Sequence, residues 1–183
     1  QVTMTFRSSK GKDLPVPEKE SPQYAIRAHA ETIIQNLFES RGTQIEVVPT
    51  RDKQYRVLFS IDGLRQPVEQ LPAAEGAAII DFFKAAAGLD VEDRRRKQKA
   101  MMSISRPNAT PRDARVSAMG GSAGMQLNLL LDPEQEVKRR VEELGLFPNQ
   151  LEDIKSLVEE QAGVVLVAAP RHKIGRASCR ERV

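Results

Sequence analysis

The chain has 183 residues, with 28 lysines and arginines against 25 aspartates and glutamates, which gives a formal net charge of +3. Its single cysteine, Cys179, lies near the C-terminus, so the rest of the chain excludes disulfides, thiolate metal sites and thiol nucleophiles and fits a reducing setting. No apolar stretch reaches about eighteen residues and no signal-peptide pattern opens the chain, so the sequence predicts neither a membrane span nor a secretory signal. The chain begins at Gln1 without a Met, and we expect it to be truncated at both ends.

The first twenty residues are charged and contain prolines, which predicts a linker with room for one short strand over residues 2–6. Ser21 followed by Pro22 is a favourable start for a helix. The apolar residues that follow recur at helical spacing and are Ile26, Ala30, Ile33, Ile34, Leu37 and Phe38. Gly42 ends this predicted helix.

Two strand-like segments come next, over residues 43–50 and 55–63, with a hairpin turn at 51–53 between them. Asp62 and Gly63 form a second turn signal. This region therefore predicts an antiparallel ribbon.

A second helix is predicted between Pro72 and Gly88. Its apolar side is carried by Ile79, Ile80, Phe83 and Ala87. Three short strands are then predicted over residues 100–105, 113–120 and 124–131, separated by turn-rich segments.

The last part of the chain has a different character. Asp132 and Pro133 begin a predicted helix that ends at Gly145, an amphipathic helix covers residues 149–160, and an apolar strand covers 164–169. That strand lacks polar alternation, which is typical of a strand buried on both faces of a parallel sheet. The predicted fold is α+β, with a mostly antiparallel sheet and flanking helices, followed by the first helix and strand of an incomplete α/β domain.

The final ten residues, 174–183, resemble a short-read sequencing adapter translated in one frame, and we interpret them as a read-through artefact. They contain three arginines and one acid, so they contribute +2 of the net charge of +3 and leave +1 for the remainder. The basic pI then says little about partners, and only the run Arg94–Lys99 offers a clustered basic surface.

Short segments of the chain, taken in order, resemble the hexameric ATPases of bacterial type II secretion and type IV pilus assembly. The family pattern runs S-D-I-H-I-E-P, V-R-x-R-I-D-G, L-D-x-x-E-R-R-x-P-Q-D-G-R, R-V-S, a G-E turn, L-G-L and a last strand into G-P-T-G-S-G-K-T. The matching segments here are residues 43–49, 57–63, 89–95, 115–117, 124–125, 144–146 and 163–170. No single segment is specific, and the resemblance depends on order and spacing over residues 21–170.

The resemblance implies that residues 21–131 form the PAS-like domain that precedes the motor, and that residues 132–173 begin the RecA-like core. It implies a parent that is a cytoplasmic homo-hexamer using ATP and Mg²⁺, peripheral to the inner membrane through the platform proteins of a secretion system or pilus. The metal-binding acids and the catalytic glutamate would lie beyond the end of this chain. We therefore expect no catalytic residue, no cofactor and no ATP hydrolysis for the chain by itself.

A phosphate-binding loop needs a glycine-rich turn after a strand, a lysine for the terminal phosphates and a hydroxyl for magnesium. The resemblance places an incomplete loop of this kind at Ala169, Pro170, Arg171 and His172. Ala169 takes the place of the first glycine, and the lysine position falls on Gly175. Two interpretations stay open, a degenerate loop and a working variant.

The resemblance also departs at two strand positions. Leu58 and Ser60 stand where the family has arginines, which the resemblance would have facing nucleotide. Arg56 and Arg65 flank the motif without matching it, and either could be a phosphate ligand or an exposed strand residue. The alternative function is therefore a non-hydrolysing paralogue or a PAS-like interaction module.

The remaining candidates are weaker. His29 has no partner at metal-ligand spacing, so we expect it to be packed or exposed to solvent. As a nucleic-acid patch, Arg94–Lys99 lacks interleaved aromatic residues for stacking. We expect a charged loop there and no nucleic-acid partner.

Overall fold

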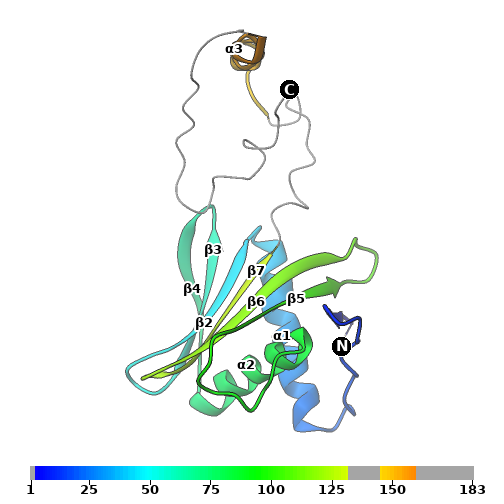
Figure 1. Ribbon diagram of the computed structural model, residues 1–183, viewed down its shortest axis with the longest axis vertical. Helices are drawn as coiled ribbons and strands as arrows, with labels where there is room; N and C mark the ends of the chain where they lie inside the picture. Colours follow the sequence, from blue (N-terminus) through cyan, green and yellow to red (C-terminus); the bar gives the residue numbers. More distant parts are fainter. Residues whose placement is uncertain (1–2, 132–144, 160–183) are drawn as a thin grey trace. The chain divides into compact units, whose positions relative to one another are not determined.

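The computed structural model describes residues 3–131 and 145–159. The chain forms two units, Gln1–Asp132 and Pro133–Val183. The first contains seven strands and two helices, shown in Figure 1. The described part of the second contains helix α3, Pro148–Glu159. Within these described ranges, no helix has the length and apolar character needed to cross a membrane.

The seven strands of the first unit form one antiparallel sheet in the order β1-β5-β6-β7-β2-β3-β4. They are β1 Thr5–Ser8, β2 Gln44–Pro49, β3 Tyr55–Ile61, β4 Leu64–Leu71, β5 Gln98–Ser105, β6 Arg112–Gly121 and β7 Gly124–Leu131. Six of the strands form two blocks that are local in sequence, β2 to β4 and β5 to β7, and the blocks meet where β2 pairs with β7. Strand β1 adds to the edge of the second block by pairing with β5. The α+β prediction with a mostly antiparallel sheet is confirmed.

Two helices, α1 (Pro22–Glu39) and α2 (Ala73–Ala87), pack against each other, and α2 contacts β1, β3, β5, β6 and β7. Both helices lie on the same side of the sheet (Figure 1). The opposite side, which we call the open face, carries no helix of this unit.

Helix α1 begins where the sequence predicts, because Ser21 Oγ accepts a hydrogen bond from the Tyr24 backbone N–H at 3.2 Å. Its predicted apolar face is also confirmed. The fully buried members are Ala30, Ile33, Ile34 and Leu37, while Ile26 and Phe38 are partly buried against the same core.

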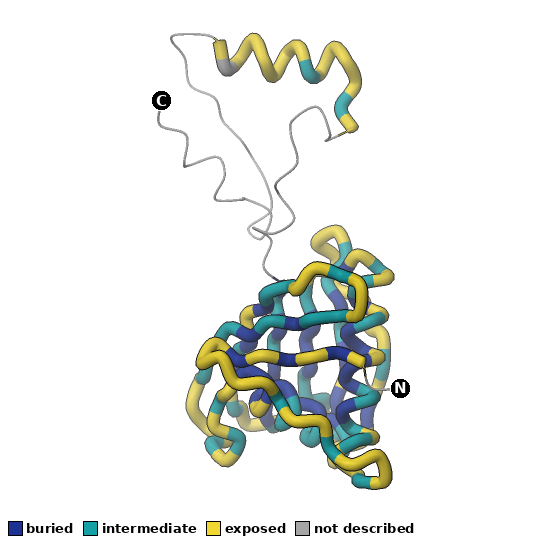
Figure 2. Tube along the Cα trace, turned by 90° about the vertical axis from the view of Figure 1, so that its right-hand side faces the viewer, coloured by how far each residue is buried: buried dark blue, intermediate teal, exposed yellow. Residues whose placement is uncertain are grey.

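Helix α2 ends at Gly88, which has a φ of 72° in the left-handed region that favours glycine. All four predicted apolar residues of α2 are buried. On the sheet, β7 alternates strictly between buried and half-buried positions, so one set of side chains reaches the helices and the other set lines the open face. Figure 2 shows this alternation along the chain.

The N-terminal segment is more than the predicted linker with one short strand over residues 2–6. The strand is present as β1, Thr5–Ser8, but it pairs with β5, and Met4 and Phe6 are 5% and 0% exposed. The strand therefore belongs to the sheet and supplies core residues. Strand β4 was not predicted, because most of its residues are exposed and it forms the opposite edge.

Helix α3 confirms the helix predicted over residues 149–160. Three other predictions lie outside the described residues: the helix from Asp132 to Gly145, the strand over 164–169 and the adapter-like segment 174–183.

One buried ion pair holds the N-terminal segment in place. Arg27 and Glu31 lie one turn apart on α1, with Arg27 Nε donating to Glu31 Oε1 at 3.1 Å and side chains only 2% and 6% exposed. The guanidinium also donates to the backbone carbonyls of Met4 and Pro15 at 2.7 and 2.9 Å. Glu31 Oε2 accepts the backbone N–H groups of Thr3 and Met4 at 2.7 and 3.1 Å.

We expect Arg27→Met to destabilise the protein by about 3–5 kcal/mol, because it leaves the Glu31 carboxylate buried without its counter-charge. The free energy of unfolding from urea titration measures this loss. The matched control is Arg7→Met, which removes an ion pair with Asp13 whose side chains are 60% and 49% exposed, and which should cost far less. Equal losses for the two variants would show that the buried pair has no special role.

Candidate functional site

The sequence-predicted phosphate loop, Ala169 to His172, lies outside the described residues. Within the described ranges, no group of three or more His, Cys, Asp or Glu side chains could hold a metal ion. The polar groups that the structure does bring together lie on the open face of the sheet, in the loop before β5 and beside His29.

The open face contains a row of polar side chains that crosses four strands. Lys99 of β5 lies opposite Ser117 of β6, which lies opposite Asn128 of β7, and Asn128 lies opposite Glu46 of β2. This row crosses a shallow depression of about 260 Å³. The depression is lined by Glu46, Val48, Arg65, Lys97, Ser117, Ala118, Met119, Gln126, Leu127 and Asn128.

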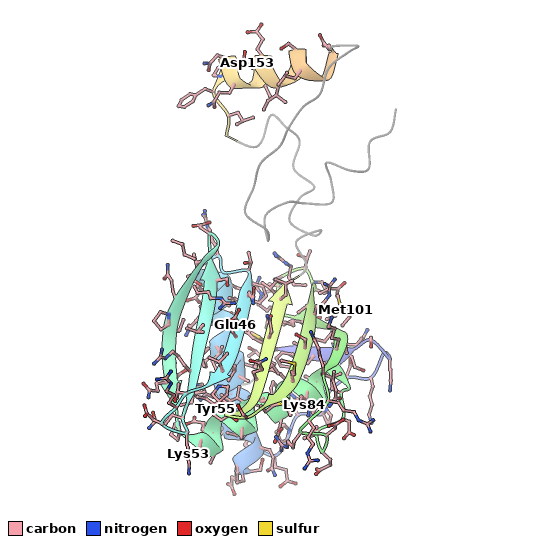
Figure 3. The ribbon with its side chains drawn as sticks, turned by 60° about the vertical axis from the view of Figure 1, so that its left-hand side comes forward. Glu46, Lys53, Tyr55, Lys84, Met101 and Asp153 are labelled. Atoms are coloured by element: carbon pink, nitrogen blue, oxygen red, sulfur yellow. The ribbon has the colours of Figure 1, made fainter. Side chains whose placement is uncertain are left out.

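Glu46 is the buried acid of this depression, with 7% of the residue exposed. Its Oε1 accepts a hydrogen bond from Gln44 Nε2 at 2.7 Å and forms an ion pair with Arg65 Nη2 at 3.0 Å. Figure 3 labels Glu46 in the middle of the sheet. Since the Arg65 side chain is 69% exposed, the carboxylate holds one edge of the guanidinium and leaves the rest accessible to solvent.

The two positions that carry arginines in the family pattern also lie on the open face. Leu58 is the cross-strand neighbour of Glu46, and Ser60 is the neighbour of both Gln44 and Arg65. Arg56 follows the same alternation on β3 and is exposed. Arg56 and Arg65, for which the sequence left two roles open, therefore lie on the same face of the sheet as positions 58 and 60.

The loop before β5 is held by buried and bidentate contacts. Lys84 of α2 is 0% exposed, and its Nζ donates to the backbone carbonyls of Val91 and Asp93 at 3.3 and 2.7 Å. Arg94 makes two 2.7 Å bonds to the carboxylate of Asp81, which raises the pKa of that arginine. Figure 3 labels Lys84 among the side chains of the domain.

Asp93 organises the same loop from within. The backbone N–H groups of Arg96 and Arg95 donate to its carboxylate at 3.0 Å and lower its pKa. The predicted charged loop is therefore present but ordered. All three arginines are exposed, but Arg94 is paired with Asp81, and Arg96 Nε lies 3.8 Å from Asp93 Oδ2.

His29 lies between two carboxylates from different elements. Its Nδ1 is 2.8 Å from Glu75 Oε1 in the first turn of α2, and its Nε2 is 3.0 Å from Glu69 Oε2 on β4. Burial lowers the pKa of His29, but hydrogen bonds and charge from Glu69 and Glu75 outweigh it, so the net pKa is raised above 6.5. His29 is therefore packed, which is one of the two environments expected from the sequence. It links α1 to α2 and β4.

Comparison with known proteins connects this geometry to a family. The model of the family described as "Type II/IV secretion system protein" matches residues 18–171, which is most of the chain. The chain belongs to the type II/IV secretion system protein family. The resemblance found in the sequence motifs is confirmed.

Curated relatives carry related names. The type IV pilus assembly ATPase TfpB of Acinetobacter baylyi is 26% identical over 92% of this chain and 30% of the relative. The type IV pilus assembly ATPase PilB of Myxococcus xanthus is 28% identical over 75% of this chain and 24% of the relative. The type II secretion system protein E of Klebsiella pneumoniae is 27% identical over 67% and 24%. The chain thus spans about a third or less of these relatives.

Among solved structures, the VirB11 ATPase of the Brucella suis type IV secretion system, in complex with sulphate, aligns with a TM-score of 0.37 and 12% identity. The alignment covers 75% of this chain and 44% of that chain.

Because the backbone of the loop before β5 lies close to β6, we expect glycine to be required at position 120. A Cβ added at Gly120 would lie 2.0 Å from the Arg94 carbonyl oxygen, whereas one at Gly121 would meet nothing closer than Gly124 O at 3.6 Å. Gly120→Ala should therefore cost about 1–3 kcal/mol by forcing the loop backbone to move. Gly121→Ala is the matched control and should be neutral or slightly stabilising. Urea unfolding of both variants measures the difference, and equal midpoints would contradict the close approach.

The His29 bridge predicts a pH-dependent stability. Because the folded pKa is raised, the bridge contributes fully below about 6.5, the ordinary value, and its contribution is lost as pH rises through the folded pKa. We expect the free energy of unfolding to fall over that range in the wild type and to fall less in His29→Gln.

The two carboxylates supply a second measurement. Glu69→Gln and Glu75→Gln should each lower the His29 pKa measured by NMR titration, because each removes one of the charges that raise it. If the His29→Gln variant kept the wild-type pH profile, the His29 bridge would not be the cause of the pH-dependent stability.

Proposed function

We propose that this chain is part of a cytoplasmic motor ATPase that powers type II secretion or type IV pilus assembly. The observation that carries the proposal is the family match over residues 18–171, together with relatives named as pilus assembly ATPases. In this proposal, residues 21–131 form the domain that precedes the motor, residues 132–173 begin the motor core, and residues 174–183 are foreign to the protein.

In the intact parent, ATP and Mg²⁺ would bind where the strand over 164–169 ends. Ala169, Pro170, Arg171 and His172 would begin the phosphate loop, whose backbone N–H groups face the phosphates. Bound Mg²⁺ supplies charge stabilisation during phosphoryl transfer. The parent would act as a homo-hexamer, peripheral to the inner membrane through platform proteins. This chain by itself would bind no cofactor and hydrolyse no ATP.

The alternative is a non-hydrolysing paralogue, or a PAS-like interaction module, that keeps the domain without the chemistry. Three substitutions favour it. Ala169 stands at the first glycine of the loop, and Leu58 and Ser60 stand at the strand arginines. An arginine at such a place stabilises phosphate charge with a planar fork of donors, which leucine and serine cannot do.

Sequencing the genomic locus across the codons for residues 160–183 and beyond separates these functions. For the motor, we expect the frame to continue from Pro170 into a loop that contains lysine, and the protein encoded by the full frame to hydrolyse ATP in the presence of Mg²⁺. Replacing that lysine by alanine should abolish hydrolysis, and the 183-residue chain should show none.

A frame that continues without the lysine, with no hydrolysis by the purified protein, would favour the structural paralogue. A genome that encodes residues 174–183 followed by a stop codon would contradict the motor proposal and leave the interaction module.

A further inference from the structure

The two edges of the seven-stranded sheet differ in how they are covered. At one edge, the chain itself covers β1, because the Ser8 N–H donates to the Lys12 carbonyl at 3.0 Å and the Leu14 N–H donates to the Phe6 carbonyl at 2.9 Å. At the other edge, β4 ends the strand order, and no segment of the described chain pairs with its outer side. An uncovered edge strand is a template for a strand of another molecule.

Strand β4 has further properties that favour such pairing. It is eight residues long, and only Leu71 is buried. Two of its large apolar side chains, Leu64 and Val68, are 67% and 45% exposed. A long edge strand with exposed apolar side chains is the kind that associates with a second copy of itself.

Pro67 interrupts this edge near its middle. A proline nitrogen carries no hydrogen, so the residue cannot donate to a neighbouring strand. Within sheets, proline is confined mostly to edge strands, where its nitrogen can face solvent, and to bulges. Pro67 meets both conditions, because it lies on the edge strand and beside a bulge. A strand of another molecule laid along β4 would meet no donor at this position.

The bulge beside Pro67 shifts the alternation of side chains along β4. Leu58 of β3 pairs with Pro67 and Val57 pairs with Glu69, so Val68 is the extra residue between the two pairs. Leu58 lies on the open face, whereas Val57 is buried in the core. The two halves of β4 therefore differ by one residue in their alternation, and a regular strand cannot match both halves at once.

The same bulge also has a role inside the molecule, because it directs Glu69 toward the helices. Glu69 Oε2 lies 3.0 Å from Nε2 of His29 on α1. Bulges often re-aim a side chain in this way. Removing the bulge would disturb this contact, whereas a substitution of Pro67 tests the edge and leaves the bulge residue in place.

We propose that Pro67, together with the bulge at Val68, keeps the β4 edge from pairing with β4 of a second copy of this chain. Two identical edge strands can pair antiparallel about a two-fold axis, which is the commonest symmetry of protein dimers. The exposed apolar side chains favour that dimer, and Pro67 opposes it by removing one donor from each copy. The proposal concerns residues 64–71 and holds whether or not the parent is a motor.

Sedimentation of the full chain over a range of concentrations tests the proposal with Pro67→Val and Pro67→Ala. We expect Pro67→Val to self-associate about tenfold more tightly than the wild type, because a two-fold pair gains one hydrogen bond per copy. Pro67→Ala should associate more tightly than the wild type but less than Pro67→Val, since it restores the donor without an apolar side chain. It also decides the test if Pro67→Val does not fold.

Amide hydrogen exchange locates the association. Exchange of residues 64–71 should slow as the concentration of Pro67→Val rises, and it should not change with concentration in the wild type. The His29 pKa, measured by NMR in dilute protein, should be the same in Pro67→Val as in the wild type, which verifies that Glu69 and the bulge are in place.

Two further variants serve as controls. Pro107→Val makes the same exchange at an exposed proline between β5 and β6, and it should sediment as the wild type does. Adding Val68→Lys to Pro67→Val should restore wild-type sedimentation, because a lysine on an edge strand opposes pairing.

Three results would overturn the proposal. The first is wild-type sedimentation by the Pro67 variants with an unchanged His29 pKa. The second is equal association of Pro67→Val and Pro107→Val, or association that Val68→Lys does not reverse, since either would mean that the contact does not use β4. The third is slowed exchange of residues 64–71 in the concentrated wild type, which would mean that the edge pairs despite its proline.

Discussion

The buried pair of Arg27 and Glu31 is the constraint on which the first unit depends. Two charges in a dry interior are stable only when each is paired and its remaining donors or acceptors are satisfied. Here the satisfying groups are backbone atoms of Thr3, Met4 and Pro15. The N-terminal segment must therefore lie against α1, which places β1 beside β5 and Phe6 in the core.

The single seven-stranded sheet also depends on contacts between residues that are distant in sequence. The blocks β2 to β4 and β5 to β7 each form from neighbours in sequence, and they become one sheet only through the pairing of β2 with β7. Because both helices cover the same face (Figure 1), the other face keeps every second side chain of five central strands free of helical cover. That arrangement creates a broad polar surface from residues that are not adjacent in the chain.

The contacts of Lys84 and Arg94 show how this chain orders a highly charged loop. A buried ammonium on α2 satisfies two carbonyls of the loop, and Asp81 fixes the first arginine of the basic run. Gly120 is needed because the loop backbone lies directly against β6. The predicted charged loop is thus divided between arginines that make structural contacts and exposed charge.

The sequence by itself determined the elements whose signals are local. The cap at Ser21, the apolar spacing in α1 and α2, the glycine after α2, the β2–β3 hairpin and the three strands β5 to β7 were predicted because capping, periodicity and turn chemistry act within a few residues. It also determined the family, since the motif order survives low identity.

Only the tertiary structure decided the rest. The sequence predicts a short strand in the N-terminal linker but not its place in the sheet, because the groups that hold it are the distant residues Arg27 and Glu31 and strand β5. Strand β4 was not predicted because an exposed edge strand has no burial pattern. The same reason applies to the open face. Arg65 and Lys97 are 32 positions apart in the sequence, and both line one depression because strand register and alternation place them there. No local signal in the sequence encodes that register.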